Sequence, residues 1–241
     1  MRLIAVGFLI LALAAPFAAA QQPAAAQQPA AAPATDRVAA LKASLQQSAA
    51  ALRRYEWIET TVVSLKGEEE SNQESKCYYG ADGKVQKVPI ESAPEGGGKS
   101  PRGLRGRIVE NKKEEISDSM KEAVGLVKQY VPLDPVLIQA AKDAGRVTVN
   151  PPDGQGKARI VIADYLKAGD SVAIDVDAAA SRLAGLAVST FTDKEKHAVT
   201  LKVGMAALAD GTSYPASSVL DVTEDRISVA VTNSGYRKAT S

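Results

Sequence analysis

The sequence is poor in the side chains that most often build cross-linked or metal-binding sites. It contains one cysteine, Cys77, and one histidine, His197, among 241 residues. A single cysteine excludes an intramolecular disulfide, so burial of apolar side chains must stabilise the fold. Cys77 and His197 also lie 120 positions apart, which is unlike the clustered spacing of zinc ligands. We therefore expect neither a bound metal nor a cofactor.

The chain has little of what nucleophilic catalysis requires. A Ser-His-Asp or Cys-His centre would have to use His197, because no other histidine is present. An activated nucleophile also needs a partner that orients the base. His197 stands at the expected start of a strand, just after a charged turn, where a surface role is more typical. We expect no enzymatic activity.

An excess of charge of one sign is also missing. The chain carries 29 basic and 28 acidic residues, and removing an N-terminal segment that contains Arg2 leaves 28 of each. This balance provides no field to attract nucleic acid or an anionic membrane, where phosphate contacts by Lys and Arg dominate affinity. Nucleic-acid binding is therefore not expected.

Two segments resemble ligand-binding motifs only in part. Residues 96–100, Gly-Gly-Gly-Lys-Ser, would complete a phosphate loop only with glycine at position 93, where the chain has Ala93. We interpret this segment as a loop. An acidic patch lacks the spacing of an EF-hand and is expected at solvated strand and turn positions. Its members are Asp164, Asp170, Asp175 and Asp177.

The N-terminus has the pattern of a secretory signal. Arg2 is the only charge before an apolar run, residues 3–17, which is followed by the three alanines 18–20. We predict a signal peptide at 1–20 with cleavage after Ala20, and a periplasmic or secreted protein with no transmembrane segment after cleavage. Residues 21–35, rich in Ala, Gln and Pro, are expected to form a flexible linker. Residues 36–241 are then one domain.

Apolar spacing predicts three helices. The first runs from an N-cap at Asp36 to about Arg54, the second ends before Pro132, and the third begins at Asp134 and Pro135 and ends at Gly145. Leu133 is placed to pack on Ile138 as a hydrophobic staple. The buried stripe of the first helix is Val38, Leu41, Leu45, Ala49 and Leu52, and that of the second is Ile116, Met120, Ala123, Val124 and Val127.

The remaining segments alternate with a period of two and predict strands. Three form a meander at 55–65, 73–79 and 85–90, with a turn at Asp82-Gly83 and another at Gly67 with its glutamates. Four more lie near 172–176, 199–205, 214–220 and 227–231. We predict an α+β fold: about ten strands in one strongly curved antiparallel sheet, a half-barrel, with about three helices packed on its concave face.

This order of elements resembles that of the lipoprotein-sorting superfamily of periplasmic half-barrels. An N-terminal amphipathic helix runs directly into a long strand at Leu52-Arg53-Arg54-Tyr55-Glu56-Trp57, and a meander, central helices and further strands follow. The superfamily includes the outer-membrane lipoprotein carrier, its receptor and a sensor that regulates an anti-sigma factor. A second stretch, Cys77-Tyr78-Tyr79-Gly80-Ala81-Asp82-Gly83-Lys84-Val85-Gln86-Lys87, looks like a motif of uncharacterised exported bacterial proteins.

The resemblance implies a non-enzymatic binding protein that holds a lipid or an acylated protein between sheet and helices. A basic loop is interpreted either as solvated or as a contact for an anionic headgroup or an acidic partner. The alternative function is a protein-interaction or sensor module of the cell envelope with no small ligand. Cys77 is expected to be a small buried residue, although a pairing thiol is also consistent with the pattern. The residues expected to line the ligand cavity are Trp57, Val63, Met120, Val124, Leu137, Leu201 and Val203, and those of the basic loop are Lys99, Arg102, Arg105 and Arg107.

Overall fold

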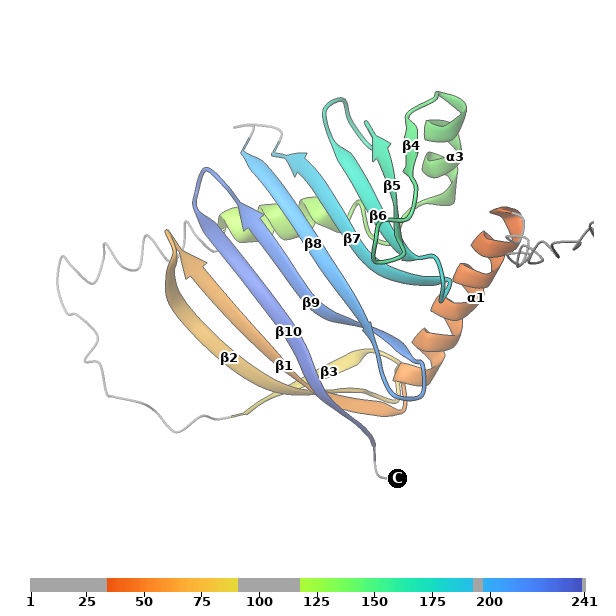
Figure 1. The fold of residues 1–241 in the computed structure, drawn as a ribbon. Helices are drawn as coiled ribbons and strands as arrows, with labels where there is room; N and C mark the ends of the chain where they lie inside the picture. The colour runs from red at the N-terminus through yellow and green to blue at the C-terminus, as the bar shows by residue number, and fades with distance from the viewer. Residues whose placement is uncertain (1–33, 91–117, 193–196, 240–241) are drawn as a thin grey trace, which may run out of the picture. The chain divides into compact units, whose positions relative to one another are not determined.

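The alternating segments of the sequence form one antiparallel sheet. The computed structural model describes residues 34–90, 118–192 and 197–239, all within the compact unit Ala34–Ser241 (Figure 1). In these residues ten strands pair in the order β3-β2-β1-β10-β9-β8-β7-β6-β5-β4. The strands are β1 (Tyr55–Leu65), β2 (Glu68–Tyr79), β3 (Val85–Pro89), β4 (Val147–Asn150), β5 (Lys157–Ala163), β6 (Ser171–Asp177), β7 (Arg182–Phe191), β8 (Ala198–Ala207), β9 (Ser213–Val222) and β10 (Ile227–Lys238).

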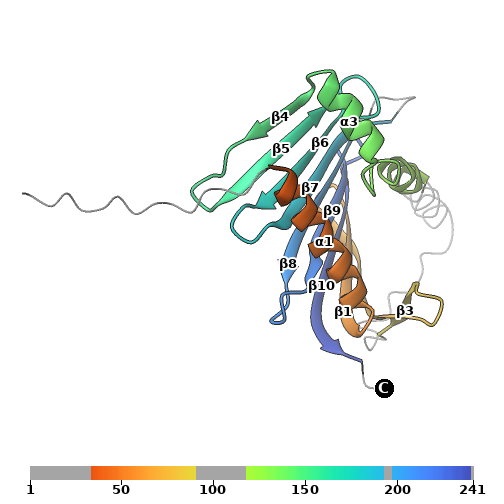
Figure 2. The same cartoon turned by 90° about the vertical axis from the view of Figure 1, so that its right-hand side faces the viewer.

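Three helical segments accompany the sheet in the described part of the chain. They are α1 (Ala34–Leu52), residues 118–127, and α3 (Pro135–Asp143). The sheet curves toward the segment at 118–127, which lies on its concave face (Figure 2). This segment passes behind the sheet in Figure 1, so that view shows the convex face. The predicted α+β half-barrel is confirmed. No described helix is both long and apolar enough to cross a membrane.

Apolar side chains from seven strands line up across the concave face. Residues paired across an antiparallel ladder point to the same face, so the registers place them side by side. Three members of this row, Ile162, Val172 and Val188, are at most 1% exposed. The row consists of Val63, Val229, Leu220, Leu201, Val188, Val172 and Ile162.

The second and third helical segments belong to two buried clusters that include or contact five of the seven residues of this row. Ala123 and Val127 pack with Leu220 and its neighbours in one buried cluster. Tyr130, which follows the helix, and Ala141 of α3 pack with the β5–β7 end of the row in another. Full burial of one aliphatic side chain stabilises a fold by about 1.5–3 kcal/mol. The core therefore lies under residues 118–143, on the β5–β9 half of the sheet.

The start and end signals of α3 are confirmed. The Asp134 carboxylate accepts a hydrogen bond from the Val136 N–H at 2.8 Å, and Pro135 occupies the first helical turn. Gly145 follows the last turn with φ +69°, a conformation that favours glycine.

Helix α1 differs from its prediction in two ways. It begins at Ala34 and ends at Leu52, so Asp36 lies in its first turn rather than at the N-cap. Its fully buried residue is Ser48, while Leu45 is 37% exposed and Ala49 is also exposed. The Ser48 hydroxyl accepts a hydrogen bond from the Ser213 N–H at 3.0 Å, so a polar contact with β9 determines which face of the helix turns inward.

Strand β2 is longer than the sequence predicted. It starts at Glu68, so the glutamates expected in a turn belong to the strand. This half of β2 has no apolar alternation, because its side chains are exposed or half-buried. This half of the strand is defined by its ladder with β1, which runs from Leu65↔Glu68 to Glu56↔Tyr78, and not by a pattern in its side chains.

Two glycines in the sheet provide a stability test. A Cβ at Gly185 would lie 3.0 Å from the Val203 backbone oxygen, whereas a Cβ at Gly204 would meet only the Ser217 hydroxyl, at 2.8 Å. A side chain can rotate away and a paired backbone cannot. We expect Gly185→Ala to destabilise the protein by about 1–3 kcal/mol and Gly204→Ala by clearly less, measured by urea unfolding. Equal losses would contradict this interpretation.

Candidate functional site on the concave face

Four of the seven expected cavity residues lie at or beside the helix-covered core. Met120 packs against one buried cluster, Leu137 against the other, and Leu201 against both. Val124, on the same helical segment as Met120, is 36% exposed. The structure therefore brings Met120, Leu137 and Leu201 together as packing contacts of the core.

The other three lie on the concave face beyond the helical cover. Val63 belongs to the apolar row, and Val203 is paired with Ser218, which in turn is paired with Val231 of β10. Val63, Val203 and Val231 are half-buried. Together with the neighbouring Val229, also half-buried, they form an apolar floor that the described helices leave partly open. Trp57 lies at the end of this floor.

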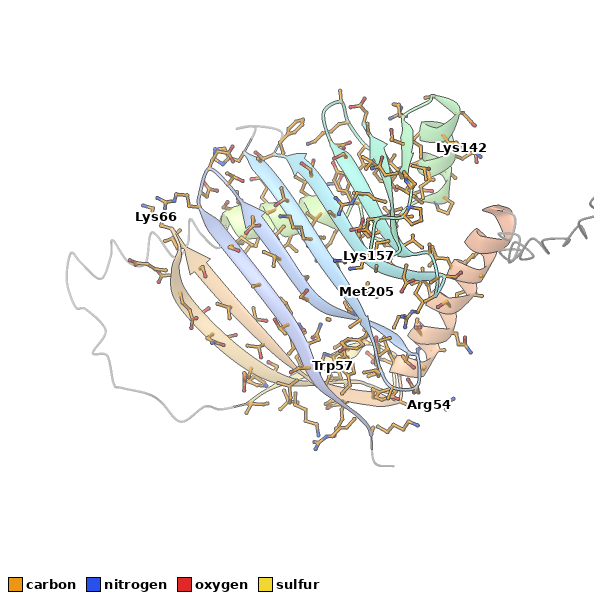
Figure 3. All side chains as sticks on the ribbon, in the orientation of Figure 1. Arg54, Trp57, Lys66, Lys142, Lys157 and Met205 are labelled. Atoms are coloured by element: carbon orange, nitrogen blue, oxygen red, sulfur yellow. The ribbon has the colours of Figure 1, made fainter. Side chains whose placement is uncertain are left out.

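Trp57 belongs to an aromatic cluster that sequence reasoning missed. Its ring stacks on Tyr236, with centroids 5.4 Å apart and an interplanar angle of 10°. Tyr79 lies 5.7 Å from Trp57, and Tyr214 lies 4.3 Å from Tyr236. Tyr55 meets Tyr236 edge-on at 6.4 Å. We call these five residues, from β1, β2, β9 and β10, the aromatic cluster; Figure 3 labels Trp57.

A β-bulge turns Tyr236 into this cluster. Glu56 pairs with Arg237 and Ile58 with Ser234, so two residues of β10 stand opposite Trp57. One of them, Gly235, has φ +62°, the left-handed conformation typical of such bulges. The extra residue shifts the alternation, and Tyr236 therefore points to the same face as Trp57.

Polar groups fix the position of the cluster. The Trp57 indole N–H donates to the Asn233 side-chain oxygen at 3.0 Å, and the Asn233 amide donates to the Pro215 carbonyl at 2.9 Å. At the edge strand β3, Lys87 forms an ion pair with Glu59 at 2.5 Å. Burial, followed by nearby anion-forming groups, raises the pKa of Tyr236. The site therefore combines apolar ring surface with an ion pair at its rim.

The Tyr55 hydroxyl donates to the Asp210 carboxylate at 2.5 Å. This bond, with a further contribution from Thr212, lowers the pKa of Asp210 to about 2. A carboxyl whose pKa falls on folding stabilises the protein above its unfolded pKa, and this stability is lost as the pH falls through the folded pKa. The contribution is therefore complete above about pH 4 and disappears toward about pH 2.

We expect Tyr55→Phe to be less stable than the parent at pH 7, with a difference that shrinks as the pH falls from about 4 to about 2. Urea unfolding at pH 7, 4 and 2.5 measures this difference. A difference that is the same at all three pH values would show that Tyr55 acts only through packing.

Cys77 lies behind the cluster. It pairs with Trp57 across β1 and β2 and is 0% exposed, which confirms the expected small buried residue. Burial raises the pKa of its thiol. Cys77 is a free cysteine.

His197 lies beside a carboxylate, but in an order that differs from a nucleophilic triad. Its Nδ1 is 3.5 Å from Asp225, and the Ser119 hydroxyl donates to the other oxygen of the same carboxylate. In a triad the imidazole accepts the hydroxyl proton and the acid orients the imidazole. Here Asp225 stands between the two, joining the 118–127 helix to the β9–β10 turn.

The acidic patch is not uniformly solvated, contrary to expectation. Asp170 is 3% exposed and accepts hydrogen bonds from the Tyr130 hydroxyl and from three backbone N–H groups. Asp175 holds Arg159 through two bonds, of 2.6 and 2.8 Å. Asp164 and Asp177 accept backbone N–H bonds in turns. Within the described residues, no group of three or more His, Cys, Asp or Glu side chains is arranged to hold a metal ion.

The basic loop lies outside the described residues, as do the glycine-rich segment and Ile116. The positions concerned are Lys99, Arg102, Arg105 and Arg107.

Comparison with known proteins gives no family assignment. No family model and no curated protein matches this chain. Among solved structures, a DUF1329 family protein from Desulfovibrio piger is similar with a TM-score of 0.40 and 12% identity, covering 83% of this chain and 93% of that one. A LolA superfamily protein from Nitrosomonas europaea gives a TM-score of 0.36 and 6% identity, covering 83% and 94%. These TM-scores and identities assign no function, so we infer the function from the geometry of this chain.

Proposed function

We propose that this domain is a non-enzymatic carrier that holds a lipid or an acylated ligand on its concave face. The observation that supports the proposal is that the aromatic cluster and the apolar floor of Val63, Val203, Val229 and Val231 share the concave face, with the pair Glu59 and Asn233 between them. Apolar ligand sites combine such surfaces with a few placed polar groups. The Glu59–Lys87 pair provides polar groups at the rim.

The proposal places the acyl chain along the floor. The half-buried valines are less buried than the core under the 118–127 helix, and their remaining surface is the part that a chain would remove from water. Each CH₂ transferred from water contributes about 0.8 kcal/mol. A chain of twelve carbons therefore has enough driving force for measurable binding even after the cost of ordering it.

The single tryptophan gives a direct test. Trp57 is the only tryptophan in the sequence, so its emission reports on the aromatic cluster alone. We expect bromododecanoate to quench this emission with saturation, and dodecanoate to compete. Native mass spectrometry of gently purified protein, before and after organic extraction, would identify an endogenous ligand. Unchanged emission together with a mass that extraction does not alter would rule the carrier function out.

A second candidate function, binding of an envelope protein partner without a small ligand, is favoured by the edges of the sheet. Strands β3 and β4 each pair on one side only in the described residues. β4 has the sequence Val-Thr-Val-Asn and carries no charge, and Val149 is 65% exposed. Uncharged exposed edges are suited to strand addition. A ligand-free mass combined with capture of a partner lost on Val149→Lys would support this function instead.

A further inference from the structure

A pocket of about 140 Å³ opens on the sheet next to the aromatic cluster, where three charged residues, one serine and several apolar residues meet. Figure 3 labels Lys157 of β5 and Met205 of β8, two of its members, which lie close together in that view. Lys157 pairs with Asp177 and Asp177 with Arg182, so the three charged side chains share one face of neighbouring strands. The pocket is lined by Lys157, Asp177, Arg182, Leu183, Ala184, Met205, Ala206, Ala207 and Ser213.

Two irregularities in the sheet form this pocket. The pairing of β6 with β7 shifts between Asp175 and Val176, and that of β8 with β9 shifts between Gly204 and Met205. A β-bulge bends its strand and changes the direction of the side chains that follow. The β7–β8 ladder also ends at Gly185 and Gly204, so the pocket lies where the lining residues of β7 and β8 are no longer paired with each other.

The charges at the pocket are not balanced internally. Lys157, Asp177 and Arg182 are consecutive cross-strand neighbours on β5, β6 and β7. One Asp177 oxygen accepts the Ala179 and Ala180 N–H groups, and the other is 3.7 Å from the Arg182 guanidinium, beyond hydrogen-bond distance. Within the described part of the chain, Lys157 forms no direct ion pair. Two cations thus retain donors for an anion.

A second hollow on the sheet also contains two cations, but both of them contact a carboxylate. It measures about 150 Å³ and is lined by Glu56, Trp57, Ile58, Lys76, Gly235 and Arg237. Both of its cations are bonded to Glu56, Lys76 at 2.6 Å and Arg237 through its Nε. Each of its cations thus has a carboxylate within hydrogen-bond distance, which neither Lys157 nor Arg182 has among the described residues, so the first pocket is the better anion site.

We propose that the pocket between β5 and β9 binds a small organic anion. Lys157 and Arg182 contact its carboxylate or phosphate group, and Met205, Leu183 and Ala184 contact a short apolar part. The volume admits only a few non-hydrogen atoms beyond the charged group. This site is proposed separately from the carrier function, although the two sites are neighbours, because Ala206 of the pocket pairs with Tyr214 of the aromatic cluster.

Titration of the isotope-labelled full chain, followed by NMR, tests the proposal. The probes are butyrate and butyl phosphate, with butyramide and butylammonium as neutral and cationic analogues and inorganic phosphate as an anion without a chain. We expect saturable shifts at residues 157, 182–184 and 205–207 with butyrate or butyl phosphate. The two analogues should bind at least tenfold more weakly. Whichever anion binds more tightly identifies a carboxylate or a phosphate ligand.

Matched variants locate the contacts. We expect Arg182→Gln and Lys157→Gln each to weaken anion binding about tenfold, equivalent to about 1.4 kcal/mol. Lys202→Gln, which removes an exposed cation outside the pocket, should leave it unchanged. Equal weakening by all three variants, or equal binding of butyramide, would overturn the proposal. Inorganic phosphate that binds as tightly as butyl phosphate would overturn its apolar part. Quenching of Trp57 by bromododecanoate should be unaffected by Arg182→Gln, so the two proposals can fail separately.

Discussion

Replacing Asp170 by alanine is expected to destabilise the protein by about 3 kcal/mol or more, because the substitution leaves several buried donors without an acceptor. The carboxylate accepts the Tyr130 hydroxyl at 2.6 Å and the N–H groups of Tyr165, Leu166 and Lys167 at 2.5–3.1 Å. Tyr130 is 0% exposed and also contacts the Thr190 hydroxyl at 2.7 Å. The network joins the β5–β6 turn to the chain between the 118–127 helix and α3.

Asp170→Asn and Asp164→Asn refine this prediction. The first keeps the size and one acceptor oxygen, so we expect a smaller loss of about 2 kcal/mol. The second changes an aspartate of the same turn that has φ +49° and whose carboxylate accepts the Gly169 N–H. Asparagine tolerates that conformation, and the expected loss is under about 1 kcal/mol. Urea unfolding followed by circular dichroism measures all three. A loss for Asp170→Ala no larger than that for Asp164→Asn would show that water replaces the carboxylate.

Trp57→Ala should have the largest effect on the β1–β10 half of the sheet. Removing a large buried aromatic side chain costs about 3–5 kcal/mol. The change also leaves Asn233 without its indole donor and Tyr236 without the ring on which it stacks. If the carrier proposal is correct, endogenous ligand detected by native mass spectrometry is lost as well.

Tyr78 offers the matched control. It follows Cys77 on β2, is 37% exposed, and belongs to the opposite face, so Tyr78→Ala should cost less than about 1 kcal/mol and leave any ligand bound. Trp57→Phe retains an aromatic ring and should fall between the two. Comparable unfolding free energies for Trp57→Ala and Tyr78→Ala would mean that the aromatic cluster contributes little to the fold.

The sequence predicted those parts of the fold in which the pattern of side chains reflects burial of one face or a local capping contact. Strands such as β6 and β8 alternate because one face is buried, and α3 is bounded by residues whose chemistry is local, Asp134 and Gly145. The first half of β2 has no such pattern, since both its faces carry exposed or half-buried polar side chains. Helix α1 was misread because a buried serine has no apolar signal.

The aromatic cluster was beyond sequence reasoning for a different reason. Trp57 and its partner Asn233 are 176 positions apart, and only the pairing of β1 with β10 brings them together. A constant alternation along β10 would also have placed Tyr236 on the wrong face, because the bulge at Gly235 is what reverses it. Buried Asp170 was missed because its hydrogen-bond donors come from two separate segments, the adjacent turn at 165–167 and Tyr130, which is 40 positions away. Such contacts follow from topology rather than from local pattern.

The position of β10 in the sheet also affects how the chain reaches this structure. The last strand pairs with the first long strand, so Tyr55 stands opposite Lys238, and among the described strands β10 is the one through which the meander β1–β3 pairs with the rest of the sheet. Closing a loop of this length costs entropy before any ladder bond forms, and folds with such distant pairings are typically slow, on the order of milliseconds to seconds. The β1–β3 meander therefore stays without its main partner until the C-terminal strand arrives. During that interval the β1 edge is open to other chains, which makes the order of synthesis a hazard for aggregation.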